Sequence, residues 1–254
     1  MRIHEPAAPR RSLRLADLGA IAALLIVAVS VAWPALSSVR QRAQQAACFG
    51  GLGSIGSAIG MYGSDNRSSL PMASDSPAGS TWWNVGRPEQ SNSANLFTLS
   101  RTGFIKPTLM SCSGNSASKA CHFDDDCQDW TCLDQVSYSY QNLFARNRPT
   151  LDASSRFVVL ADKNPCVVRA VKRERVIYIN ENSPNHAGRG QNILFSDGHA
   201  LWTETPVLES GDNVWLPKSI ERLIDSARGV KSASQTGPLK GVEEPEAADA
   251  FVCP

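Results

Sequence analysis

His186, Asp197 and His199 are the residues of this sequence whose types and spacing offer acid–base or metal chemistry. An imidazole beside a carboxylate is a general acid–base pair, and two imidazoles with a carboxylate form a set of metal ligands. The dipeptide Asp197-Gly198 is also a strong hairpin-turn signal, so we expect Asp197 to serve a turn and His186 to be structural. The chain has no nucleophile elbow, phosphate loop or zinc-protease helix, and we predict that it is not an enzyme.

The cysteines are a second group that can do chemistry. Of the seven, four gather in the loop 112–132, and these are Cys112, Cys121, Cys127 and Cys132. In a domain outside the cytoplasm such cysteines are expected to form disulfides, although the sequence does not resolve their pairing. Zinc is the alternative, but the spacing lacks the repeated C-x-x-C that is typical of zinc sites. The odd total leaves at least one thiol free or intermolecular, and Cys48 is a candidate for an intermolecular bond.

Asp124, Asp125 and Asp126 lie between two of these cysteines. Hard carboxylate oxygens suit a structural calcium ion, whereas three consecutive acids more often form a solvated loop. We therefore predict no cofactor, with structural calcium as the alternative at this loop.

The chain has an uncharged apolar stretch at residues 18–36, which is long enough to cross a hydrocarbon core of about 30 Å as a helix. Such a helix would anchor the rest of the chain at the membrane. Four arginines precede it and two follow it closely: Arg2, Arg10, Arg11 and Arg14, then Arg40 and Arg42. This excess predicts a cytoplasmic N-terminus and an extracytoplasmic, periplasmic remainder of the chain. A secretory signal cleaved after Ala32 is the alternative, but the apolar run is longer than a usual signal core. The net charge of +1 gives no electrostatic reason to expect a nucleic-acid partner.

Periodicity predicts that this helix continues outward to about Tyr62 and is kinked at Pro34. One face of the continuation carries large residues, namely Cys48, Leu52, Ile55, Ile59 and Tyr62, and glycines cluster beside it. Each glycine costs about 1 kcal/mol in a helix interior, so this stretch needs a partner that packs closely over it.

The remainder predicts a small, mostly antiparallel sheet. We expect strands at residues 136–140, 157–161, 167–171, 175–179, 192–195 and 200–203, with the last two joined across Asp197-Gly198, and a short helix at residues 94–102. Residues 64–95 are expected to form a loop, with Trp82-Trp83 as its anchor on the surface or in the core of the domain. The predicted parts are a basic leader (1–12), a transmembrane helix (13–36), its exported continuation (37–63), a β-rich domain (64–218), and a tail (219–254) that is largely disordered after a short amphipathic stretch.

The start of the chain resembles the prepilin signature, in which a basic leader precedes a helix that opens with Phe-Thr-Leu-Ile-Glu-Leu. The corresponding residues are 13–18, with Asp17 in place of the glutamate, and Pro34 lies as far beyond Asp17 as the family's proline lies beyond its acid. Further stretches are similar to those of pilin-like proteins best known from planctomycete-type bacteria: residues 37–71, 137–142, 160–165 and 185–199. The last is similar to a prepilin-associated C-terminal element named for a histidine and a downstream Asp-Gly, here His186, Asp197 and Gly198.

The resemblance implies an α+β pilin-like fold, in which the outer half of a long transmembrane helix packs on the sheet. It also implies a non-enzymatic pseudopilin subunit of the inner membrane, which assembles with other pilin-like subunits into a type II secretion or type IV pilus-like fibre. A prepilin peptidase would cut between Ser12 and Leu13, and Asp17 would pair with the freed amine of a neighbouring subunit. Ser12 stands where the family has glycine, and without cleavage Asp17 would pair with Arg14 or lie at the headgroups. One alternative is a monomeric membrane-tethered periplasmic binding module, in which the pilin helix is only an anchor and the cysteine-rich loop binds a ligand or a metal. The other is an exported hydrolase that uses His186 and Asp197.

Overall fold

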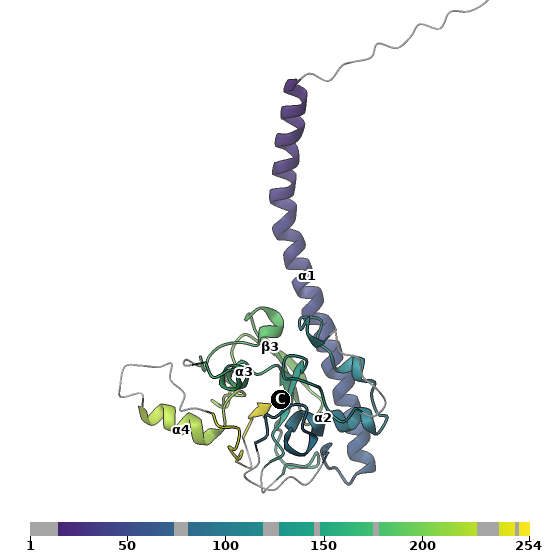
Figure 1. Cartoon of the computed structure of the whole chain (residues 1–254), viewed down its shortest axis with the longest axis vertical. Helices are drawn as coiled ribbons and strands as arrows, with labels where there is room; N and C mark the ends of the chain where they lie inside the picture. The colour runs from purple at the N-terminus through teal and green to yellow at the C-terminus, as the bar shows by residue number, and fades with distance from the viewer. Residues whose placement is uncertain are drawn as a thin grey trace, which may run out of the picture. The chain divides into compact units, whose positions relative to one another are not determined.

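The computed structural model describes residues 15–73, 81–118, 127–144, 148–174, 178–227, 239–246 and 249–254. The chain divides into two compact units, Met1–Ala43 and Gln44–Pro254. The boundary falls several residues beyond the predicted end of the transmembrane segment at residue 36. One helix, α1 (Leu15–Asp65), contributes to both units (Figure 1).

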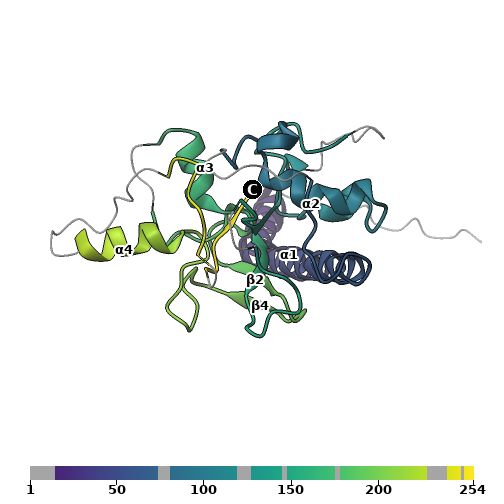
Figure 2. The ribbon, with the colours of Figure 1, turned by 90° about the horizontal axis from the view of Figure 1, so that it is seen from below.

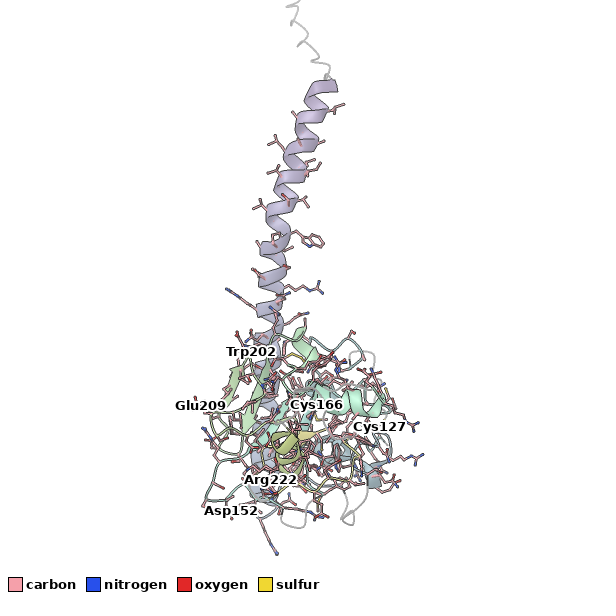
Figure 3. The ribbon with its side chains drawn as sticks, turned by 90° about the vertical axis from the view of Figure 1, so that its left-hand side faces the viewer. Cys127, Asp152, Cys166, Trp202, Glu209 and Arg222 are labelled. Atoms are coloured by element: carbon pink, nitrogen blue, oxygen red, sulfur yellow. A yellow bond between two sulfur atoms is a disulfide. The ribbon has the colours of Figure 1, made fainter. Side chains whose placement is uncertain are left out.

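In the first unit, α1 carries apolar side chains on all sides. Leu24 and Ile26 are each 70% exposed and Trp33 is 74% exposed, and Figure 3 shows the side chains of this stretch standing free along the helix. The helix continues through Pro34. It is long and apolar enough to cross a membrane, and no residue of its most apolar window is buried.

The second unit is built on a five-stranded sheet in the order β4-β3-β2-β1-β5. Its strands are β1 (Tyr138–Gln141), β2 (Val158–Asp162), β3 (Gln191–Phe195), β4 (Ala200–Thr203) and β5 (Val252–Cys253). All four pairings are antiparallel. The predicted hairpin is confirmed, because β3 and β4 pair directly and Gly198 in their turn has φ of +82°, a conformation that favours glycine.

Helices cover both faces of this sheet (Figure 2). One face packs against the part of α1 beyond Gln44 and against α2 (Asn92–Arg101). The other packs against α3 (Pro165–Val171) and α4 (Lys218–Ala227). The inner strands are therefore buried on both sides. A register shift between Val158 and Leu160 lets two successive residues of β2 face the same core.

Short helical turns complete the second unit. They are η1 (Pro88–Gln90), η2 (Pro107–Met110) and η4 (Pro184–His186), and each begins with a proline, whose fixed φ suits the first helical position. The predicted short helix near residues 94–102 is present as α2.

The predicted packing face of α1 is confirmed in the second unit. Cys48, Leu52, Ile55 and Ile59 are all buried, and Tyr62 packs against the same core. Two glycines of α1 allow the helix to approach the sheet closely. A Cβ at Gly51 would lie 3.0 Å from the Tyr138 hydroxyl, and one at Gly56 would lie 3.0 Å from the Leu194 side chain. Gly50, Gly53 and Gly60 have open space instead.

Two sequence predictions of strands need correction. Residues 167–171 lie in helix α3, because the side chain of Asn164 accepts a hydrogen bond from the Val167 amide and Pro165 occupies the first turn. Of the predicted strand 175–179, residues 175–177 lie outside the described part, and Tyr178 and Ile179 are not in a strand.

The prediction of a largely disordered tail is wrong for its last residues. Phe251 is fully buried, and the strand β5 that follows it pairs with β1. Two buried amides hold it there. Asn92 Nδ2 donates to the carbonyl of Cys253, and Asn164 Nδ2 donates to that of Val252. Trp82 is also fully buried, and its ring lies 5.4 Å from that of Phe251, so the predicted tryptophan anchor is confirmed.

Candidate functional sites: the apolar helix and a buried His–Asp network

The exposed apolar surface of α1 is the first candidate site. Side chains such as Leu25, 61% exposed, and Val31, 69% exposed, have an energetic cost in water of about 25 cal/mol for each Å² of apolar surface. A lipid bilayer or apolar helices of other subunits would remove this surface from water. Ser12 and Leu13 lie outside the described residues, as does the side chain of Asp17.

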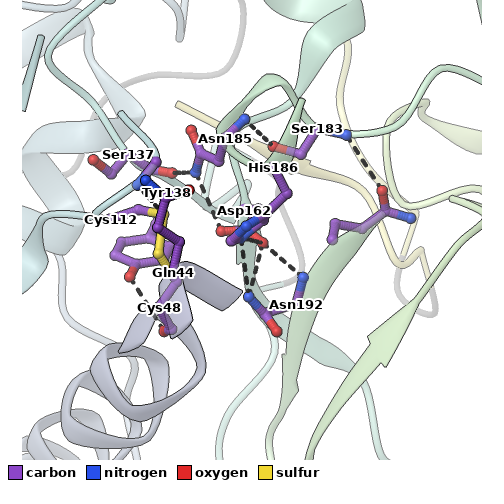
Figure 4. A network of polar contacts seen from close by, with 12 residues as sticks. Gln44, Cys48, Cys112, Ser137, Tyr138, Asp162, Ser183, Asn185, His186 and Asn192 are labelled. Atoms are coloured by element: carbon purple, nitrogen blue, oxygen red, sulfur yellow. Dashed lines mark hydrogen bonds and ion pairs between the residues drawn. A yellow bond between two sulfur atoms is a disulfide. The ribbon is translucent and has the colours of Figure 1, made fainter. Parts of the chain in front are cut away.

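His186 belongs to a second site, a buried polar network beside the sheet (Figure 4). It lies at the end of η4, and its Nε2 is 3.1 Å from Oδ2 of Asp162, the last residue of β2. His186 is 3% exposed and Asp162 is fully buried. The His186 ring also makes an edge contact with Trp202 of β4, with centroids 5.1 Å apart.

The carboxylate of Asp162 is saturated with donors. Its Oδ2 accepts the backbone N–H of Asn192 at 2.7 Å and the Asn192 amide group at 3.1 Å. Its Oδ1 accepts from the amide of Asn185 at 3.2 Å. The contact of His186 Nε2 with Asp162 is a hydrogen bond in the tautomer that carries its proton on Nε2, whereas the 3.2 Å contact of Nε2 with the Asn192 amide nitrogen is one only in the other tautomer.

Two glycines leave space for the backbone segments that carry this network. A Cβ at Gly114 would lie 1.7 Å from the Asn185 carbonyl oxygen, and one at Gly190 would lie 2.5 Å from the Thr203 carbonyl oxygen. Only glycine fits at either position without movement of the backbone. The Asn185 amide also donates to the Ser137 carbonyl at 2.7 Å, which ties η4 to the residue before β1. The network therefore joins η4 to β2, β3 and the residue before β1, and Gly114 packs closely against it.

The structure does not bring His186 and Asp197 together as a catalytic pair. Asp197 is half-exposed in the β3–β4 turn, where its Oδ1 accepts the His199 N–H at 2.9 Å and its Oδ2 lies 3.8 Å from Arg156. The histidine has Asp162 as its carboxylate partner instead. The hydrolase hypothesis thus has no support from the geometry of this pair.

The disulfide pairing differs from the prediction. Cys112 pairs with Cys48 of α1, with Cα atoms 5.0 Å apart, so Cys48 is not available for an intermolecular bond and Cys112 does not pair within its own loop. Cys48 lies on the buried face of α1, which brings it to the segment that holds Cys112. Cys127 and Cys132 are free thiols in the described part of the chain. Cys121 and Asp124–Asp126 lie outside the described residues, so the calcium prediction is not tested there.

The other two cysteines are also free and are buried. Burial raises the pKa of the Cys166 thiol to about 12 and raises that of Cys253 well above its usual value. Neither forms a thiolate near neutral pH, so neither is a reactive group.

The structure also has a groove of about 940 Å³ beside β4. One wall is a stack in which the Arg156 guanidinium lies 4.4 Å from the centre of the Phe195 ring and His199 stacks on the same ring. Asp212 and Glu221 line the groove as well. Burial, and then the neighbouring Asp212 and Asp249 carboxylates, raise the pKa of Glu221 to about 7, against hydrogen bonding from the Asn213 N–H.

Sequence reasoning did not identify Asp162 or Asn192 as partners of His186. Both lay in stretches that carried the family resemblance, at 160–165 and 185–199, but no local pattern links a strand-terminal aspartate to a histidine farther along the chain. No protein-family model, no curated protein and no solved structure matches this chain.

Proposed function

We propose that this protein is a non-enzymatic pilin-like subunit, held in the inner membrane by the first part of α1 and assembled through it with other subunits of the same kind. The observation that carries the proposal is the change in environment along one helix. Before Gln44, α1 has exposed apolar side chains on all sides; beyond it, one face is buried in an α+β unit. A membrane anchor that continues as the core helix of an exported domain is the arrangement that the prepilin resemblance implies.

The buried network supports a structural role for the C-terminal element. His186 is 3% exposed and packs against Asp162, Asn192 and Trp202, so its ring is not presented to a substrate at the surface of the described structure. The hydrogen bonds of the network connect η4 with β2, β3 and the residue before β1. The Asp-Gly of the same element serves the β3–β4 turn. Both halves of the element therefore act on the shape of the domain.

Membrane retention is tested with two leucines of similar exposure. Leu25 is 61% exposed in the apolar stretch of α1, and Leu223 is 58% exposed on α4. Leu25→Arg places a charge near the middle of the apolar stretch, at a cost of about 2.5–3.5 kcal/mol for insertion. We expect the wild-type chain and Leu223→Arg to remain with membranes after alkaline extraction and Leu25→Arg to be lost from them. Recovery of the wild-type chain in the soluble fraction would contradict the proposal.

Assembly and processing need a separate measurement. A photo-crosslinking residue at Val29 should join copies of the chain, or this chain to other pilin-like subunits, in native membranes. The same residue at Leu223 is the control and should give no such product. Mass spectrometry of the N-terminus should find Leu13 as the first residue, because cleavage frees the amine that Asp17 is expected to pair with. A chain that begins at Trp33 would instead identify a cleaved secretory signal.

The groove beside β4 favours a second candidate, a membrane-tethered binding module. Its Arg156–Phe195 stack and its carboxylates suit a ligand with both apolar and cationic groups. This candidate predicts that Phe195→Ala abolishes ligand capture while crosslinking at Val29 yields only monomers. The subunit proposal predicts crosslinked multimers, whether or not the groove is altered.

A further inference from the structure

We propose that Cys48, Cys112 and His186 form a redox-gated zinc site, which binds one Zn²⁺ when the disulfide is reduced. One ligand atom from each of these three buried residues lies within 4.8 Å of the other two. A tetrahedral zinc ion with its usual bond lengths needs sulfur and nitrogen ligands about 3.5–3.8 Å apart. Opening of the S–S bond thus brings the three side chains into the range of one ion.

The surroundings of the histidine favour a metal ligand. Zinc-binding histidines usually donate their second ring nitrogen to a carboxylate, which fixes the tautomer and the ring orientation. His186 has such a carboxylate partner, since its Nε2 lies 3.1 Å from Asp162 Oδ2, and in the tautomer with the proton on Nε2 the zinc ligand would be Nδ1. Asp162 is itself held by the Asn192 N–H and the Asn185 amide. Asp162 thus orients His186, and Asn192 and Asn185 in turn orient Asp162.

The surroundings of Cys112 Sγ favour a thiolate. The Gly114 N–H donates to Cys112 Sγ over 3.4 Å, whereas the Ser113 hydroxyl, 3.4 Å from Cys48 Sγ, donates its proton to the Gln44 carbonyl. A donor at this range stabilises the negative charge of a zinc-bound sulfur more than it stabilises a neutral disulfide sulfur. Gly114 is also a position where a Cβ would strike the Asn185 carbonyl, so the N–H that faces Cys112 is fixed by packing. A water molecule would complete the fourth zinc position.

The disulfide and the zinc-bound form exclude each other, because both use the sulfur atoms of Cys48 and Cys112. Their interconversion needs a reductant. A dithiol of a thiol–disulfide exchange protein transfers two electrons and two protons to the disulfide, becomes a disulfide itself, and leaves Cys48 and Cys112 as thiols. Zn²⁺ then binds both sulfur atoms and the His186 nitrogen, and the two thiol protons pass to water. The outer half of α1 thus stays tethered to the segment 112–114 in either state.

The test uses the full-length chain in detergent. The disulfide is reduced with a water-soluble phosphine, which is oxidised to its oxide as water supplies the oxygen and the protons, and ZnCl₂ is then added. After gel filtration we expect one zinc ion per reduced chain and none per oxidised chain. Cys48→Ser should lose the ion, whereas Cys132→Ser, at an exposed free thiol, should keep it. Asp162→Asn should weaken zinc binding about 10–100-fold, as the loss of an outer carboxylate does in other zinc sites.

A wild-type measurement guards against variants that fail to fold. Co²⁺ added to the reduced chain should give the intense visible bands of a tetrahedral site and a sulfur-to-metal charge-transfer band. Peptide mapping should show that Zn²⁺ slows the alkylation of Cys48 and Cys112 but not that of Cys132. The proposal is overturned if the reduced chain binds no zinc, if Cys48→Ser retains it, or if Cys132 is the protected thiol.

Discussion

Asp162→Asn probes the network that organises the domain, because it changes one atom of a fully buried side chain. The best orientation of the new amide keeps its oxygen toward Asn192 and His186, where three N–H groups lie within 3.1 Å of Oδ2. Its NH₂ group then faces the amide of Asn185, which donates to Oδ1 in the native network. Two donors would meet without an acceptor.

The cost follows from the bonds that change. Each of the three retained bonds loses its charge assistance, which is worth about 1 kcal/mol, and the mismatched donor pair at Asn185 costs about 1–3 kcal/mol. The sum is about 4–6 kcal/mol. We therefore expect the unfolding free energy to fall by about 4 kcal/mol, which corresponds to about 10 °C in Tm for a domain of this size.

Asp197→Asn is the matched control. Its carboxylate is half-exposed, accepts one backbone N–H and lies 3.8 Å from Arg156, so the loss should stay below about 1 kcal/mol. Thermal unfolding of the full-length chain in detergent, followed by tryptophan fluorescence, measures both variants. If the two variants lost equal stability, Asp162 would not be the carboxylate that holds the network.

Three other changes test separate parts of the domain. Gly114→Ala places a Cβ 1.7 Å from the Asn185 carbonyl oxygen, so we expect it to destabilise the fold by about 2 kcal/mol or more, measured by chemical denaturation under oxidising conditions. Cys112→Ala removes a crosslink to Cys48 across a sequence separation of 64, which predicts a loss of up to about 4 kcal/mol, and a reducing agent should lower the stability of the wild-type chain but not of the variant when zinc is absent. Burial raises the pKa of Asp249 from 3.8 to about 6, although backbone hydrogen bonds act against this rise, so between these pH values the folded state holds a proton that the unfolded state lacks. The stability that this group contributes, on the order of 3 kcal/mol, is present below pH 4 and is lost as the pH rises to 6. Asp249→Asn should flatten that part of the curve of unfolding free energy against pH.

Local patterns predicted the elements that are local in origin. The apolar face of α1, the helix α2 and the β3–β4 hairpin follow from periodicity and from one Asp-Gly dipeptide. Helix α3 was mistaken for a strand because its valines favour strands, whereas the signal that decided its structure was the capping Asn164 with Pro165 after it. A valine-rich run this short is ambiguous unless its first turn is examined.

Elements that depend on distant partners were not predictable in this way. β5 has only two residues and follows a stretch rich in polar residues, so no hydrophobic periodicity predicts it. Its place in the sheet depends on β1 and on the amides of Asn92 and Asn164, which lie far from it in the chain. The His186–Asp162 pair also depends on the tertiary fold. The order of the strands brings η4 to the end of β2, and no spacing in the sequence indicates this contact.

Cys48 shows how a correct pattern can yield a wrong pairing. The periodicity that predicted a packed face of α1 already included Cys48, and a cysteine on such a face is covered by its own domain, where the nearest thiol is that of Cys112. The disulfide joins α1 to the domain within a few residues of Gln44, where the second unit begins. Several glycines follow on the same helix and weaken it, each by about 1 kcal/mol. The disulfide therefore holds the start of the glycine-rich stretch against the segment 112–114 and offsets part of that cost.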